Sequence, residues 1–306
     1  MSSWRLWAFV EACLRTAQAV FMKIVGVAIH DAASAHVYSG GIGIVNIFFG
    51  LFGRRDRPLY AGRKNTILSL TVGVFSHLAN MLGPISFMLG APLAARTFIA
   101  AMSVIPGMFL GRFVRGERLS WLQLWSIPIF VFGAWAILGG PDIVTLILAP
   151  PAWVLLTLLV ACTNAGNETM RSAMSKDYSP MVNNFWVGLV TVTLSGAGAI
   201  VFWGFGLLDF GQISSVLLWM TVASGVVVSV MTAASLMAYK GDALIALKKV
   251  FVNSFYLVSA AIADSIIFGV KMTALKWLGI LCFMVAVTMT DKTALVFLFR
   301  RKVRRA

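Results

Sequence analysis

The sequence predicts an all-α polytopic membrane protein with ten transmembrane helices, arranged as two inverted repeats of five helices. Of its 306 residues, 59% are hydrophobic and 12% are charged, whereas soluble proteins average about 45–50% and about 25%. The apolar residues form stretches of about 20 residues, the length that crosses a bilayer as a helix. A related segment occurs in each half of the chain. This composition excludes a water-soluble enzyme.

Glycine, proline and charged residues divide the chain into ten apolar segments. We expect helices over 6–28, 33–53, 66–85, 90–111, 120–139, 152–172, 181–203, 215–238, 244–268 and 274–292. The first segment is unusual because Glu11, Arg15 and Lys23 interrupt it. No small-residue cleavage site follows a clean apolar core, so the sequence favours a bundle helix with one wet face over a removable signal peptide.

The basic residues predict the orientation. With a cytoplasmic N-terminus, 18 of the 25 Lys and Arg residues fall in cytoplasmic segments, and only Lys271 and Lys276 fall outside. Such a bias predicts that both termini are cytoplasmic, and the basic tail over 299–306 is expected to touch anionic lipid rather than a partner protein. The 18 residues are Arg5, Arg54, Arg55, Arg57, Arg63, Lys64, Arg112, Arg115, Arg118, Arg171, Lys176, Lys240, Lys292, Arg300, Arg301, Lys302, Arg304 and Arg305. The net charge of +14 is therefore a sign of topology and not of a nucleic-acid partner.

An internal repeat supports the division into two halves. Aligning Gly116 with Gly269 gives a shift of 153 residues, and Gly90 corresponds to Gly241 with a shift of 151. Because each half has an odd number of segments, the second copy must enter the membrane in the opposite orientation. We expect one five-helix repeat over 1–148 and a second over 149–306.

The segment Phe113-Val-Arg-Gly-Glu-Arg-Leu-Ser-Trp-Leu-Gln123 resembles the signature of the drug/metabolite transporter superfamily, in its ten-helix branch with two EamA-type domains. The second copy departs from the pattern, with Val270 and Lys271 in place of Gly-Glu, and with Asn253 near a position where proline is common. The first copy keeps its proline at Pro106. The resemblance implies a secondary transporter that moves a small polar or anionic metabolite by alternating access, by exchange or with proton coupling, in a bacterial inner membrane.

Ionisable residues at membrane depth are the candidate functional residues, since each costs about 2.5–3.5 kcal/mol there. Arg96 and Lys249 lie about a turn and a half inside corresponding helices. Each begins a stripe on one helix face: Arg96, Ala100, Ser103 and Gly107 in the first half, and Lys249, Asn253 and Tyr256 in the second. Two cations facing one cavity would bind a phosphate or carboxylate. The alternative is that each cation only pairs with Glu168, Glu11 or Asp264.

Further residues are candidates for coupling or gating. Glu11 and Arg15 are spaced i,i+4 and form either a structural ion pair or a cavity-lining pair that a substrate or proton can break. Glu168, with Asn164 on the same face, is the candidate for proton coupling or gating, and Arg171 is expected at the interface. Lys248 lies about 100° from Lys249 and is expected to extend toward the membrane surface.

His77 and Asn80 share a face of the third predicted helix. We interpret this pair as a possible substrate contact, although a lone histidine in a bundle more often makes a hydrogen bond between helices. Asn80 and Asn164 complete the predicted substrate-binding set with Arg96, Lys249, Asn253, Tyr256 and His77.

The sequence has no Gly-rich phosphate loop, no His/Cys cluster with metal spacing and no nucleophilic triad in register. We therefore expect no enzymatic activity, no cofactor and no metal. The expected partners are a small-molecule substrate and the lipid bilayer, and the expected state is a monomer or homodimer. The alternative function is an exporter of amino acids, other zwitterions or drugs, in which Arg96 and Lys249 hold a carboxylate and Glu168 holds the amine. A protein that handles lipid within the membrane is less favoured.

Overall fold

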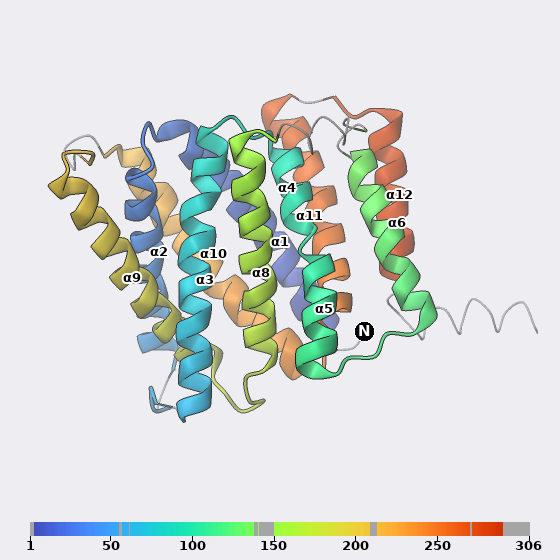
Figure 1. Cartoon of the computed structure of the whole chain (residues 1–306), viewed down its shortest axis with the longest axis horizontal. Helices are drawn as coiled ribbons and strands as arrows, with labels where there is room; N and C mark the ends of the chain where they lie inside the picture. Colours follow the sequence, from blue (N-terminus) through green and yellow to red (C-terminus); the bar gives the residue numbers. More distant parts are fainter. Residues whose placement is uncertain are drawn as a thin grey trace, which may run out of the picture.

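The computed structural model describes residues 3–54, 57–60, 62–137, 140, 150–208, 213–269 and 271–289. Its regular secondary structure there is entirely helical, in a single bundle (Figure 1). The helices are α1 (Ser3–Ala28), α2 (Ser34–Gly53), α3 (Arg63–Met88), α4 (Leu93–Ala101), α5 (Val104–Arg115), α6 (Trp121–Ile137), α8 (Ala152–Ser172), α9 (Pro180–Gly204), α10 (Ser215–Lys240), α11 (Ile245–Phe268) and α12 (Ala274–Met289).

Each predicted segment corresponds to helix in the structure, with one correction. The segment predicted as one helix over 90–111 is broken into α4 and α5 at Met102 and Ser103. Pro106 lacks the N–H that would bond the Met102 carbonyl, so the regular ladder cannot continue there. That carbonyl instead accepts from the Ile105 N–H at 3.0 Å, in a tighter turn. The predicted end of the last segment and the basic tail lie outside the described residues.

The helices pack in a regular order across the bundle (Figure 1). At one edge α2 packs against α9, and at the opposite edge α6 packs against α12. Between these edges, α1 packs against α10 and α11, while α3 and the α4–α5 pair pack against α8. The centre of the bundle is therefore built from both halves of the chain.

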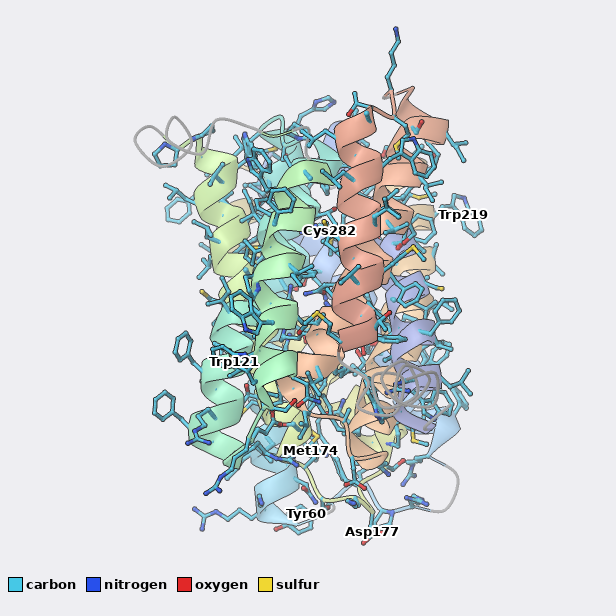
Figure 2. The ribbon with its side chains drawn as sticks, turned by 90° about the vertical axis from the view of Figure 1, so that its right-hand side faces the viewer. Tyr60, Trp121, Met174, Asp177, Trp219 and Cys282 are labelled. Carbon is cyan, nitrogen blue, oxygen red and sulfur yellow. The ribbon has the colours of Figure 1, made fainter. Side chains whose placement is uncertain are left out.

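The surface and the helix lengths are those of an integral membrane protein. Six helices are long and apolar enough to span a bilayer, with α4 and α5 taken together as one of the six, while α6 and α12 are shorter apolar helices. Large apolar side chains such as Phe52, Trp219 and Ile266 are 72–80% exposed, and Figure 2 shows Trp219 on the flank of the bundle. Apolar exposure of this extent is unusual in water-soluble monomers.

The segment after α5 makes a hydrogen-bonded contact between the first half of the chain and α11 in the second half. Gly116 adopts the left-handed conformation (φ 64°) that ends α5. Both carboxylate oxygens of the next residue, Glu117, accept from the Ile245 N–H at 3.0 Å. Burial raises the pKa of the Glu117 carboxyl, and the bonds from the backbone N–H groups of α11 and the nearby Arg115 oppose that shift. Glu117 thus caps the first turn of α11, a helix of the other half.

Candidate functional site

A cavity of about 70 Å³ lies in the centre of the bundle, with room for about five water molecules. It is lined by α1, α3, α4, α8, α10 and α11, and so by both halves of the chain. Its polar and charged lining residues are Arg15, Gln18, Ser76, Asn80, Arg96, Asn164, Asn167, Glu168, Arg171, Thr232, Asn253 and Tyr256.

A network of ion pairs forms one wall of the cavity. Arg15 donates to Glu11 at 2.6 Å and to Glu168 at 2.7 Å. The Lys248 ammonium lies 2.8 Å from Glu11 and 2.6 Å from Glu168. The two carboxylates and the lysine are at most 1% exposed. The predicted i,i+4 pair of Glu11 and Arg15 is therefore present, as part of a larger cluster that joins α1, α8 and α11.

The prediction that Lys248 extends toward the membrane surface is wrong. Its ammonium also donates to Ser235 Oγ at 2.6 Å and lies 4.3 Å from the centre of the Tyr239 ring. The Tyr239 hydroxyl donates to Glu168 at 2.5 Å. Lys248 points inward because two buried carboxylates there offset the cost of removing its charge from water.

Arg171 also departs from its expected place at the interface. Its side chain is 5% exposed and lines the cavity. One of its terminal nitrogens lies 3.9 Å from Glu168, another lies 3.5 Å from the Thr232 hydroxyl, and its Nε has no hydrogen-bond partner. Arg171 is thus buried with only long polar contacts.

Arg96 lines the cavity from α4 and is 3% exposed. Its Nε donates to Ser86 Oγ at 3.0 Å, and its guanidinium lies 4.9 Å from the centre of the Phe87 ring. One terminal nitrogen is 3.8 Å from the sulfur of Met22. Among the side chains that the structure describes, which do not include that of Asp264, no carboxylate lies within 4.0 Å of Arg96.

Lys249 and Asn253 lie at the break between α4 and α5. The Lys249 ammonium donates to Ser103 Oγ at 3.1 Å and to the Asn164 carbonyl at 3.5 Å. The Asn253 amide donates to the Ala101 carbonyl at 3.0 Å. The break leaves this carbonyl without its helical hydrogen bond, and a side chain of α11 replaces that bond. Asn253 also lines the cavity, whereas Lys249 lies just behind the lining.

The remaining predicted substrate residues divide into two groups. Asn80, Asn164 and Tyr256 line the cavity. The structure does not place His77 on the lining: its Nδ1 lies 3.1 Å from the hydroxyls of both Ser39 and Ser195. This geometry is that of the interhelix hydrogen bond weighed as the alternative for His77.

Several site residues were missed by the sequence reasoning. Gln18 donates to the Asn80 side chain at 3.2 Å, and Thr232 and Tyr239 contact the charged residues of α8. A signal was present for α10, because Thr232, Ser235 and Tyr239 form a polar stripe at i, i+3 and i+7 in an apolar helix. A comparable signal marked Gln18, which continues the stripe of Glu11 and Arg15 at i, i+4 and i+7 on α1.

The charges around the cavity do not cancel. Among the described side chains that line the cavity or belong to its ion-pair network, four are cations and two are carboxylates; the cations are Arg15, Arg96, Arg171 and Lys248, and the carboxylates are Glu11 and Glu168. Both carboxylates are already engaged by Arg15 and Lys248. An excess of buried positive charge is suited to binding an anion. In the described part of the chain, no group of three or more His, Cys, Asp or Glu residues could hold a metal ion.

Comparison with known proteins identifies the fold but no family. No protein-family model and no curated protein matches the chain. The chain is similar to a solved structure described only as a crystal structure of a protein, with a TM-score of 0.70 and 16% sequence identity. The match covers 96% of this chain and 99% of that one. The described part of the chain therefore has a fold similar to one that has been observed experimentally.

Proposed function

We propose that this protein is a secondary transporter that moves a small polar or anionic metabolite across a membrane by alternating access. In this proposal the chain crosses the membrane ten times, as two inverted five-helix repeats of the drug/metabolite transporter type. The basic loops face the cytoplasm, and the membrane is the inner membrane of a bacterium.

One observation carries the proposal: a cavity at the centre of the bundle, lined by both halves, has more buried positive charge than its described carboxylates neutralise. Arg96 lines it from the first half and Arg171 from the second, and Lys249 lies next to it. Burying an uncompensated charge lowers stability, and a structural role alone gives no reason to accept that cost. Binding an anionic solute in the cavity gives one.

The packing order supports the inverted repeat. When α1, α2 and α3 are matched with α8, α9 and α10, and α4–α5 and α6 with α11 and α12, each main contact has a counterpart. The contact of α1 with α10 matches that of α8 with α3, and the contact of α1 with α11 matches that of α8 with the α4–α5 pair. Many transporters that work by alternating access have such repeats, with the substrate site at the interface between them.

The charges favour an anion over a zwitterion. In the zwitterion alternative Glu168 would hold the substrate amine, but both of its oxygens already accept hydrogen bonds, from Arg15, Lys248 and Tyr239. An amine would have to displace one of these donors. Glu168 remains the candidate for proton coupling, because protonating it would remove one of the two carboxylate partners that Arg15 and Lys248 share with Glu11.

Counterflow into proteoliposomes tests the function. Vesicles holding the purified protein are loaded with unlabelled solute, and the uptake of the labelled solute is followed for inorganic phosphate, dicarboxylates, nucleotide sugars and amino acids. We expect uptake of an anion that needs internal solute and falls in Arg96→Ala and Lys249→Ala. Exposed Arg118, which does not line the cavity, supplies the control Arg118→Ala. Wild-type uptake by both cavity variants, with normal folding, would exclude this anion site.

A further inference from the structure

Arg171 and Arg96 approach the cavity from opposite halves, on α8 and α4. Both are buried, and neither has a carboxylate at hydrogen-bonding distance among the described side chains: the nearest to Arg171 is 3.9 Å away. The remaining polar contacts of Arg171 are a 3.5 Å approach to Thr232 and an unpartnered Nε. Arginine presents five N–H donors in a planar fork, so both side chains have unused donors.

Other polar atoms of the lining also lack partners. The Asn80 amide nitrogen and the Asn167 amide oxygen are buried without a hydrogen bond. Buried polar atoms are nearly always bonded. Three unpartnered polar atoms, on Asn80, Asn167 and Arg171, therefore lie around one small cavity.

The charge balance decides how many charges the ligand brings. Arg15, Arg96, Arg171 and Lys248 face two carboxylates, an excess of two positive charges. A zwitterion leaves this excess unchanged, and a monoanion leaves one charge. A dianion removes both charges, gives Arg96 an ionic partner and gives Arg171 a closer one than Glu168 at 3.9 Å.

On the basis of the proposed function, we propose that the transported solute is a compact dianion, a dicarboxylate or a phosphate monoester, and that Arg171 is the second residue, with Arg96, that selects for it. Each arginine fork pairs with an anionic oxygen, bidentately where the group allows. The Asn80 amide N–H donates to a further anionic oxygen, and the Asn167 amide oxygen accepts from a hydroxyl group where the solute carries one.

Ligand-induced thermal stabilisation of the purified full-length protein at pH 7.5 tests the charge requirement without mutation. The probes are succinate, its monomethyl ester, ethyl phosphate and glutamine. A dianion should bind at least tenfold more tightly than the monoester and glutamine, and the better of succinate and ethyl phosphate identifies the anionic group. Equal stabilisation by the monoester, or stabilisation only by glutamine, would overturn the proposal.

Arg171→Lys and Arg96→Lys test the two arginines, because lysine keeps the charge and loses the fork. We expect each variant to lose at least tenfold in affinity for the dianion and much less for the monoester. Arg118→Lys is the matched control and should match the wild type. Selectivity unchanged in both cavity variants would remove the arginines from the site. If a variant fails to fold, the wild-type ester comparison still decides the proposal.

The two proposals fail separately. Dianion binding without counterflow in proteoliposomes would contradict transport and keep the dianion site. Counterflow of a monoanion or a zwitterion would keep transport and contradict the dianion site.

Discussion

Arg96 in α4 and Lys248 in α11 lie at the same distance from the start of their helices, three residues after Leu93 and Ile245. Both are buried, at 3% and 1% exposure. Lys248 lies within 2.8 Å of two carboxylates and a serine hydroxyl. Arg96 bonds a serine hydroxyl and lies against a methionine sulfur and an aromatic ring. One cation is neutralised by the protein, and the other has no described carboxylate within 4.0 Å.

The difference teaches that a buried cation is not by itself a binding residue. Lys248 holds α11 to α1 and α8, so its role is to connect helices. Arg96 makes no such ionic connection among the described residues, and under the proposed function its charge is available to a solute in the cavity. Mutating each in turn separates stability from binding.

The largest effect is expected for Lys248→Met. This change leaves Glu11 and Glu168 buried with one cation fewer, and breaking a buried pair on one side costs about 3–5 kcal/mol. Denaturant unfolding in detergent measures the loss. The double variant with Glu11→Gln should recover part of it, because it removes one of the two charges left behind. A Lys248→Met protein as stable as the wild type would contradict the structural role of Lys248 that distinguishes it from Arg96.

Arg96→Gln should show the opposite pattern. Because it removes a cation without a described ionic partner, the free energy of unfolding should change by about 1 kcal/mol or less. Anion affinity should fall about 30-fold or more, since a hydrogen bond to a charged group contributes about 2 kcal/mol. Titration calorimetry measures the affinity. A stability loss as large as that of Lys248→Met would make Arg96 structural too.

Gly83→Ala moves the Arg96 side chain without removing it. A Cβ there would lie 2.7 Å from the Met22 sulfur and 3.0 Å from an Arg96 terminal nitrogen. We expect about fivefold weaker anion binding, or about 1 kcal/mol. The matched control is Gly196→Ala, where a Cβ meets nothing within 4 Å; it should leave affinity unchanged and stabilise α9 by about 0.5–1 kcal/mol. Equal affinities in the two variants would show that the position of the guanidinium does not matter.

The smallest expected effect is the pH dependence of stability that comes from Glu117. Its carboxylate caps the first turn of α11, whereas α4 has no side-chain cap. Burial raises the pKa of Glu117 in the folded protein, so the folded state binds its proton more readily than the unfolded state does. The resulting stabilisation is complete below the unfolded pKa and is lost as the pH rises through the folded one. Thermal melts between pH 4 and pH 7 should therefore show the wild type losing stability relative to Glu117→Gln as the pH rises. A wild type that gained stability relative to Glu117→Gln as the pH rises would contradict this prediction.

The positions of the helices could be predicted because bilayer length and charged loops mark them directly. The prediction of 152–172 coincides with α8, and 33–53 differs from α2 by one residue. The break after Ala101 was not predicted, although Pro106 was noted. Whether a proline kinks or divides a membrane helix depends on which donor bonds the backbone carbonyl that loses its helical partner. Here that carbonyl belongs to Ala101, and the donor is the side-chain amide of Asn253, 152 residues away.

The roles within the site depended on how each helix is rotated about its axis. Lys248 and Lys249 are neighbours that point about 100° apart, and the sequence favoured Lys249 as the inward cation. The structure buries both, and Lys248 makes the ion pairs because α1 and α8 bring Glu11 and Glu168 to its side. Contacts with helices distant in the sequence set the rotation of α11 about its axis. The residue pattern of α11 alone therefore does not predict which lysine makes the ion pairs.

The divided helix has a kinetic consequence. In the first half, α4 and α5 meet at a joint whose open carbonyl is held by Asn253, whereas the corresponding α11 is continuous from Ile245 to Phe268. If the halves exchange roles during transport, one arm bends at a joint and the other moves as a rigid rod. The inward-facing and outward-facing states are then not equivalent in structure or in free energy, so the forward and reverse rates between them differ. Even with equal solute on both sides, the carrier would therefore spend unequal times facing the two compartments.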